Sequence, residues 1–432
     1  MILFEKASGC KLHRNPASKK CKFLPLARWK GTLQQEDIPC PYMSISDHLE
    51  MLGTELKATW SKTKKANGDI CQSRVENTIR QWKSGKHMHY NLRSWSINQY
   101  CLSKVWFRAH SVDFRVMDVN KITSLVKSWL YQDQLLKPEE LVMHRHPSLG
   151  GLGVHHVQLK AQAALIRTFS ETAANSTFRT SLFHSILYRY HVLAETSLPN
   201  PGFPPFYSQD FFAKIRKVHL ETPLNVSKMS EKEWYRVLLE DYCTMETNQD
   251  GHQVNIMCRA ERASPATDWE HSWRLARLPG LGPENTSFVF RMMHDLLPTQ
   301  ERVARTKPRG NPACQVPGCT EVVENRAHAL VLCEGNMGVG KRVMRCIESI
   351  VPSIEVEAVL RLELGVEEDL ELPVVWMIST VFSAIWKLRT DKSRVQLYKI
   401  RAQLEAKVNL LRETRFTDSA TILDEFVVNF FY

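Results

Sequence analysis

Apolar residues recur at steps of three and four along most of the chain beyond residue 70, which is the spacing of one face of an α-helix. One stripe predicts a helix that begins after Asp118, and it consists of Val119, Ile122, Leu125, Val126, Trp129 and Leu130. An earlier stripe consists of Ile70, Val75, Ile79 and Trp82. Together with residues 101–110, which also favour a helix, these stripes predict a small helical bundle over residues 70–135.

The pattern changes at two places. The first 56 residues contain short apolar runs broken by glycine and proline, which is typical of short strands and turns. Residues 197–206 hold four prolines and a glycine, so they cannot continue a helix and predict a linker. Helical periodicity returns in residues 376–386 and 397–411. The predicted fold class is therefore mainly α, with a small mixed α/β segment at the N-terminus.

Composition narrows the class of protein further. Of the 432 residues, 43% are hydrophobic and 24% are charged, which are ordinary values for globular domains and argue against wholesale disorder. We expect no membrane-spanning segment, and the first residues lack the apolar core and cleavage site of a signal peptide. An intracellular protein, nuclear or cytoplasmic, is therefore expected. The eleven scattered cysteines suit reduced thiols plus one metal site better than a set of disulfides.

The net charge of +11 is concentrated in the first half of the chain. Residues 1–200 contain 28 Lys and Arg against 15 Asp and Glu, whereas residues 201–432 contain 29 against 31. Lysines neutralise phosphates and aromatic rings stack on bases, so a nucleic-acid surface is one interpretation. Its candidate residues are Lys11, Lys19, Lys20, Lys57, Lys62, Lys64, Lys65 and Trp82. The alternative is a solubilising basic face with tryptophans buried beneath it.

Four potential metal ligands occur at short, regular spacing. Cys314, Cys319, His328 and Cys333 are separated by four, eight and four residues, as a tetrahedral zinc site requires. Pro317 and Gly318 favour a tight turn in the first gap, and residues 327–332 predict a short helix that presents the last two ligands. A Cys3His set leaves no open coordination position, so such a zinc ion would be structural rather than catalytic. The alternative is four free cysteine and histidine side chains.

Several motifs occur in order around this set: FEKASGCKLHRNPASKK (4–20), LEMLGTEL (49–56), RHP (145–147) with GGLGV (150–154), HDLLPTQERV (294–303) and WKLR (386–389). With the cysteine and histidine set, their order and spacing resemble the C-terminal half of the reverse transcriptase of non-LTR (LINE-type) retrotransposons. The first resembles a block of form F-x-x-x-S-G-x-K-L-N-x-x-K-S, with His13 in place of Asn. The second resembles a segment associated with gripping the primer. Residues 160–265 are the least similar part.

The resemblance implies a division of the chain into six segments. They are a palm remnant (1–56), a basic helical thumb-like domain (57–196), a Pro-rich linker (197–212), a helical region (213–305), a zinc knuckle (306–345) and a helical C-terminal region (346–432). In relatives, the thumb and knuckle would hold template RNA and target DNA.

The resemblance also implies that the catalytic aspartates of the polymerase would lie just before Phe4. Asp37 and Asp47 are isolated acidic residues, so we assign no catalytic residue to this chain. We expect a fragment that binds RNA and DNA but does not polymerise by itself. The alternative is a zinc-stabilised helical scaffold for protein partners, or a transposon relic without a function.

Overall fold

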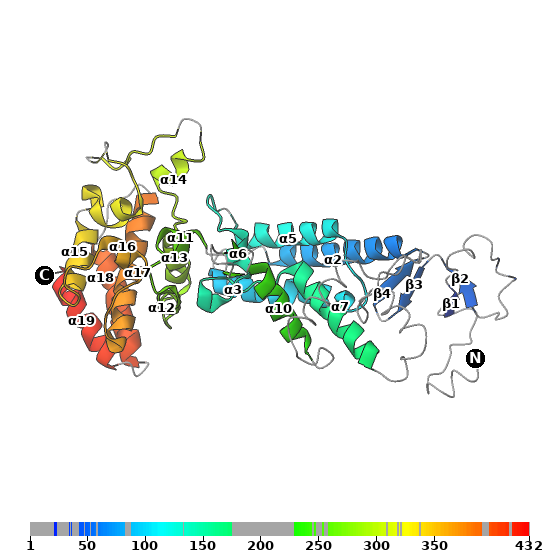
Figure 1. Cartoon of the computed structure of the whole chain (residues 1–432). Helices are drawn as coiled ribbons and strands as arrows, with labels where there is room; N and C mark the ends of the chain where they lie inside the picture. The colour runs from blue at the N-terminus through cyan, green and yellow to red at the C-terminus, as the bar shows by residue number, and fades with distance from the viewer. Residues whose placement is uncertain are drawn as a thin grey trace. The chain divides into compact units, whose positions relative to one another are not determined.

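The computed structural model describes two compact units, each drawn from several stretches of the chain (Figure 1). Unit 1 comprises residues 1–83, 97–129 and 155–242, and unit 2 comprises residues 84–96, 130–154 and 243–432. The structure describes residues 21–23, 34, 36, 43–46, 48–51, 53–57, 59–82, 88–132, 134–174, 229–243, 246–247, 253–254, 258–307, 310–317, 319, 322–336, 338–390, 397–413 and 417–431. The predicted linker at 197–212 lies outside the described residues.

Unit 1 is mostly helical, with short strands near its start. The strands form a parallel pair, β1 (Cys21–Phe23) with β2 (Met43–Ile45), and an antiparallel hairpin, β3 (His48–Met51) with β4 (Thr54–Lys57). The helices are α2 (Trp60–Gln81), a π-helical turn (Ile97–Cys101), α4 (Ser103–Ala109), α5 (Val116–Leu130), α7 (Val157–Ala174) and α10 (Glu231–Cys243). The prediction of short strands followed by helices is confirmed for the described residues.

Side chains of α2 fix this helix to strand β4. Thr59 caps the helix, since its hydroxyl accepts a hydrogen bond from the Lys62 amide. The buried Asn67 side chain bonds both backbone groups of Glu55, accepting at 3.0 Å and donating at 2.7 Å, and Thr63 accepts from the Lys57 amide at 2.8 Å. The first turns of α2, which carry the lysines, are therefore held rigidly against the hairpin.

Helix α2 extends beyond its predicted apolar stripe, and the predicted start of α5 was wrong. Helix α2 begins at Trp60, ten residues before the first apolar position of the predicted stripe at Ile70. Helix α5 begins at Val116, so Asp118 lies inside its first turn rather than before it. The Asp118 carboxylate does not cap the helix but accepts two hydrogen bonds from Arg115, at 2.6 and 2.8 Å.

Unit 2 is helical apart from one short hairpin. Its early elements are α3 (Tyr90–Ser96), α6 (Glu140–His144), a 3-10 turn (Pro147–Leu149), β5 (Glu246–Thr247) paired with β6 (Gln253–Val254), α11 (Arg259–Ala263), α12 (Trp269–Leu275), α13 (Pro283–Met293) and α14 (Gln300–Ala304). They are followed by a π-helical turn (His328–Leu332), a 3-10 turn (Glu334–Asn336), α15 (Val339–Glu348), α16 (Val356–Leu360), α17 (Glu368–Thr390), α18 (Leu397–Glu413) and α19 (Thr417–Phe431).

The core of unit 2 is built around α17. Helices α12, α13, α15, α18 and α19 all pack on it (Figure 1). Every residue from 371 to 382 is buried, which matches a helix that is apolar on all sides. The buried Glu371 is paired with Arg274 at 2.9 Å.

The length and composition of residues 368–387 would allow α17 to cross a membrane, contrary to the expectation from the sequence. However, 78% of this segment is buried inside the structure, as in the core helix of a globular unit.

The RHP and GGLGV motifs form one compact loop in unit 2. Leu152 and Val154 donate backbone hydrogen bonds to Val142 and Met143, at 2.8 and 2.9 Å. A Cβ atom on Gly151 would lie 1.9 Å from the Arg145 carbonyl oxygen, so only glycine allows this approach.

Candidate metal centre and nucleic-acid interface

The four predicted metal ligands lie together in unit 2. Their ligand atoms are all within 4.8 Å of one another. The Sγ atoms of Cys314 and Cys333 are 3.8 Å apart, and Cys319 Sγ is 3.3 Å from His328 Nε2. The sulfur atoms of Cys314 and Cys333 are not bonded, and all three cysteines are free thiols. The sequence therefore identified a group that can hold a metal ion.

These distances fit zinc. With Zn–S near 2.3 Å and Zn–N near 2.0 Å, a tetrahedral ion separates two sulfurs by about 3.8 Å and a sulfur and a nitrogen by about 3.5 Å. The first value matches Cys314 and Cys333, and the second is close to the separation of Cys319 from His328. Three thiolates and one imidazole are also the donor set that selects zinc over oxygen-loving cations.

Main-chain hydrogen bonds place each cysteine. The Cys314 amide donates to Val322 O at 2.8 Å, beside an antiparallel bridge between Ala313 and Val323. The Cys319 amide donates to Val316 O at 3.0 Å, which confirms the predicted tight turn in the first gap. Residues 328–332 form the predicted short helical segment, as a π-helical turn, and the Cys333 amide donates to His328 O at its end.

The ligands form a small cluster of their own, separate from the main core of unit 2. Apart from the three cysteines, the apolar residue that packs in this cluster is Val316. Such a small cluster buries little apolar surface, so a metal ion would supply much of the cohesion of this segment. Helix α15 begins at Val339, so the last residues of the predicted knuckle at 306–345 belong to that helix.

Burial shifts the pKa values of two of the ligands, Cys319 and His328. Burial, and then the neighbouring thiols of Cys333 and Cys314, raise the pKa of Cys319 to about 11. Burial, and then the charge of Arg389, lower the pKa of His328, which keeps its imidazole neutral as a ligand must be. Binding of a metal ion would therefore displace the thiol proton of Cys319.

Arg389 at the end of α17 reaches the metal ligands. Its guanidinium donates to Cys314 Sγ at 3.0 Å and to Cys333 Sγ at 3.6 Å, and it forms an ion pair with Glu324. The side chains of Arg389 and Glu324 are 7% and 4% exposed. Burial by itself would lower the pKa of Arg389, but the hydrogen bonds to Glu324 and Cys314 raise it overall.

Glu324 links Arg389 and the metal ligands to α14. Its carboxylate accepts from the Gln300 amide at 3.2 Å, and its carbonyl oxygen accepts from the Glu301 amide at 3.2 Å. The WKLR motif thus contacts the cysteine cluster through Arg389, and the HDLLPTQERV motif is linked to it through Glu324. Sequence reasoning noted WKLR but assigned no role to Arg389, because its sulfur partners lie 56 and 75 residues away.

The lysines proposed for nucleic-acid binding fall into three groups. Lys11, Lys19 and Lys20 lie outside the described residues. Lys57 is paired with Glu55 at 2.6 Å, and Lys64 with Asp113 at 2.8 Å. Lys62 and Lys65 are exposed on α2, and among the residues that the structure describes no acidic side chain pairs with either.

Trp82 follows α2 and is partly buried. Its ring lies 4.9 Å from that of Tyr100, which is 43% exposed. Its carbonyl oxygen accepts a hydrogen bond from the Trp129 indole at 3.3 Å. Trp82 is therefore a packing residue on one side, while the ring pair leaves part of its surface open to solvent.

The isolated Asp37 and Asp47 lie outside the described residues. Within the part of the chain that the structure describes, the cysteine and histidine cluster is the one group of three or more His, Cys, Asp or Glu side chains placed to hold a metal ion. Comparison of the chain with models of known protein families and with curated proteins gave no match.

Proposed function

We propose that this chain binds nucleic acid as the C-terminal part of a reverse transcriptase of the non-LTR retrotransposon type. Unit 1 would supply a thumb-like basic surface, and residues 306–345 a knuckle held by structural zinc. The observation that carries the proposal is the charge at the start of α2. This chain is proposed to bind nucleic acid and not to polymerise it.

The first turns of α2 combine two sources of positive potential. A helix N-terminus favours acidic residues, because the aligned peptide dipoles place positive charge there. Helix α2 has no acidic residue in its first turn and instead carries the exposed Lys62 and Lys65, beside Lys64, which is paired with Asp113. Lysines at this position oppose the stability of the helix, whereas a phosphate group would be attracted by both the lysines and the dipole.

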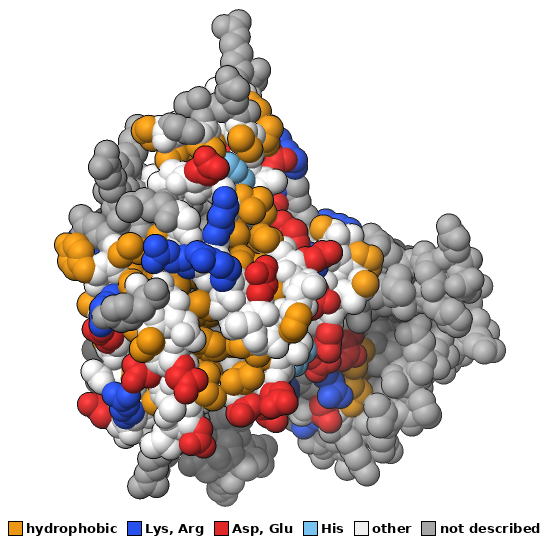
Figure 2. All heavy atoms as spheres, turned by 90° about the vertical axis from the view of Figure 1, so that its left-hand side faces the viewer, with side chains coloured by type: hydrophobic (Ala, Val, Ile, Leu, Met, Phe, Trp, Pro, Cys, Tyr) orange, Lys and Arg blue, Asp and Glu red, His pale blue; other side chains and the backbone are white. Residues whose placement is uncertain are grey.

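The surface of unit 2 has a different character. On the face shown in Figure 2, acidic and basic side chains are interspersed with apolar ones. The residues of unit 2 are also nearly balanced in charge, with 27 basic against 28 acidic residues. Binding through phosphates is therefore proposed for unit 1.

The contacts among motifs support the family resemblance. His294, the first residue of HDLLPTQERV, donates from Nε2 to the Gly150 carbonyl oxygen of GGLGV at 2.8 Å. The same HDLLPTQERV motif contacts Glu324, and Arg389 of WKLR contacts both Glu324 and Cys314. Motifs spread from residue 150 to residue 389 thus form one connected set within unit 2, as expected if they were retained together.

The test is binding of the zinc-loaded full chain to RNA and DNA duplexes, measured by fluorescence anisotropy across a salt series. If about five phosphates are neutralised, the slope of log affinity against log salt should be roughly −4 to −5, from about −0.9 per phosphate. Little sequence preference is expected, because contacts to phosphates carry no sequence information.

Two matched double variants sharpen this test. Lys62→Gln with Lys65→Gln removes two exposed charges, and the slope should become shallower by about 1.8. Lys57→Gln with Lys64→Gln removes the same charge from lysines already paired with Glu55 and Asp113, so a smaller change is expected. A wild-type slope in the first variant would contradict the role of α2.

A helical scaffold for protein partners is the second candidate function. The apolar side chains of Val322, Val323 and Leu332 are 50%, 49% and 47% exposed beside the metal ligands, as a partner surface requires. If the affinity for nucleic acid does not change with salt concentration, this function is favoured over the first.

A further inference from the structure

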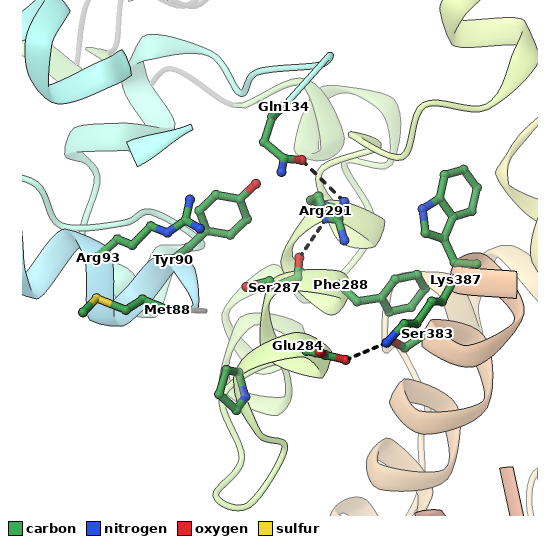
Figure 3. Close-up of a pocket in the computed structure, with 12 residues that line it drawn as sticks. Met88, Tyr90, Arg93, Gln134, Glu284, Ser287, Phe288, Arg291, Ser383 and Lys387 are labelled. Carbon is green, nitrogen blue, oxygen red and sulfur yellow. Dashed lines mark hydrogen bonds and ion pairs between the residues drawn. The ribbon is translucent and has the colours of Figure 1, made fainter. Parts of the chain in front are cut away.

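Unit 2 contains a pocket of about 700 Å³ that has no role in the proposed function. Figure 3 shows Tyr90 and Arg93 on one side of it, and Ser287 and Arg291 of α13 on the other. Trp386 of α17 also lines it. This volume lies within the range of about 300–1,000 Å³ that is usual for sites of small organic ligands.

The lining of the pocket has an excess of positive charge. Arg93, Arg291 and Lys387 line it, and the acidic residue among the lining residues is Glu284. Glu284 and Lys387 lie 3.7 Å apart, and both are exposed, so they largely offset each other. Arg93 donates to the Leu130 carbonyl oxygen at 3.0 Å, so the cation of interest in the pocket is Arg291.

Arg291 has no acidic partner among the residues that the structure describes. Its Nε donates to the Ser287 carbonyl oxygen at 3.3 Å, and its Nη1 to the Gln134 side chain at 3.4 Å (Figure 3). Burial lowers the pKa of Arg291, which shows that its charge is poorly compensated in the free protein. An anion that entered the pocket would supply the missing negative charge.

The rest of the lining restricts which anion fits. A guanidinium group matches phosphate with two parallel N–H donors. The pocket is far larger than a single phosphate group requires. The rings of Tyr90 and Trp386 offer flat apolar surface, and Gln134, Ser287 and Ser383 offer hydrogen-bonding groups, which together suit a heterocyclic base.

We propose that this pocket binds a nucleotide, with its phosphate group on Arg291. The base would lie toward the aromatic side chains of the pocket. This site belongs to unit 2, and it does not depend on the lysines of α2 in unit 1. Loss of nucleotide binding and loss of duplex binding are therefore separate outcomes.

The experiment is isothermal titration of the zinc-loaded full chain with adenosine monophosphate, adenosine and inorganic phosphate. Adenosine monophosphate should bind at least about tenfold more tightly than either of the other two. Adenosine lacks the phosphate group that would bind Arg291, and inorganic phosphate lacks the base. No binding of adenosine monophosphate at millimolar concentration, or equal binding of adenosine, would overturn the proposal.

Variants locate the site. Arg291→Met should weaken binding of adenosine monophosphate by about tenfold or more, whereas Arg361→Met, which removes an arginine outside the pocket, should not. Because Arg291 has no acidic partner to leave behind, the melting temperature of ligand-free Arg291→Met should be equal to or above that of wild type. A large fall would show that Arg291 is structural, and would overturn the proposal.

Ser383→Trp provides a second, independent variant. It places a bulky indole ring in the pocket and leaves Arg291 in place, so it should also weaken binding of adenosine monophosphate by about tenfold or more. Retained binding in this variant, with the fold intact by circular dichroism, would place the ligand elsewhere and overturn the proposal.

Discussion

The substitution Arg389→Met tests whether the buried ion pair supports the metal centre. It removes both N–H···S hydrogen bonds, to Cys314 and Cys333, and leaves the carboxylate of Glu324 buried without its partner. Breaking a buried pair by removing one member costs about 3–5 kcal/mol. A zinc ion with three thiolates carries a net charge of −1, which Arg389 would otherwise neutralise, so zinc affinity should fall by about 10–100-fold.

The double variant separates the lost hydrogen bonds from the stranded carboxylate. Glu324→Gln keeps an oxygen that can accept from the Gln300 amide, so this substitution preserves the link to α14. In Arg389→Met with Glu324→Gln the buried side chain at position 324 is no longer charged, so the fold should recover part of the stability that Arg389→Met loses. The zinc affinity should stay low, because the contacts to sulfur are still missing.

The assay is competition for zinc against a chromophoric chelator, together with urea unfolding of the full chain loaded with cobalt, whose thiolate absorption reports on the intact site. Arg361→Met is the matched control, since Arg361 pairs with the more exposed Glu363. Wild-type zinc affinity in Arg389→Met, or strictly additive effects in the double variant, would refute the reasoning.

Three further predictions concern other parts of the chain. Purified protein should hold one zinc ion that Cys319→Ser or His328→Ala releases, with loss of hydrogen-exchange protection in residues 306–345. Cys346→Ser should retain it, because Cys346 packs in the main core of unit 2; equal loss in both would contradict the ligand assignment. Primer extension on an RNA template with magnesium or manganese should give no product, and robust extension would show that a catalytic site was missed. Burial lowers the pKa of His294 from 6.5 to about 4, so the unfolded chain gains this proton first, and stability should fall by about 3 kcal/mol in total as the pH drops from 6.5 to 4. The free energy of unfolding of His294→Gln, measured in urea, should lack this part of the pH dependence. A pH profile equal to that of wild type would contradict the role of His294.

The metal ligands could be predicted from the sequence because their geometry is local. The four residues lie within 20 positions, and the turn at Pro317 and the short helical segment at 328–332 bring them together without help from distant parts of the chain. The spacing of the four residues was therefore enough to predict the metal ligands. The fold class was also predictable, since helical periodicity over long stretches is independent of tertiary contacts.

Helix starts were harder to predict because they depend on caps and not on the apolar stripe. Seven of the first ten residues of α2 are polar or charged, so the stripe becomes visible only at Ile70. The helix is nevertheless set from Trp60 by the Thr59 cap and by the contacts of Thr63 and Asn67 with β4. Polar side chains that form hydrogen bonds with backbone groups fix the start of α2, and these hydrogen bonds cannot be predicted from the hydrophobic pattern.

The sequence also could not show which lysines are paired. Lys64 meets Asp113, which is 49 residues away, whereas Lys62 and Lys65 remain exposed on the same helix. A run of lysines therefore overstates the number of charges available to a phosphate group. The structure reduces the described part of this group to two exposed lysines and makes the matched variants possible.

Two arginines of unit 2 show why the role of a cation depends on its surroundings. Arg389 and Arg291 are both withdrawn from solvent, and nothing in the sequence near either residue distinguishes them. Arg389 meets a buried carboxylate and two thiols, so its charge is compensated and its removal should destabilise the site. Among the described residues, Arg291 bonds only to neutral oxygens, and it lines an open pocket, so its removal should cost little in the free protein. A buried charge without a partner is retained at an energetic cost, and a ligand that carries the opposite charge gives a physical reason for it.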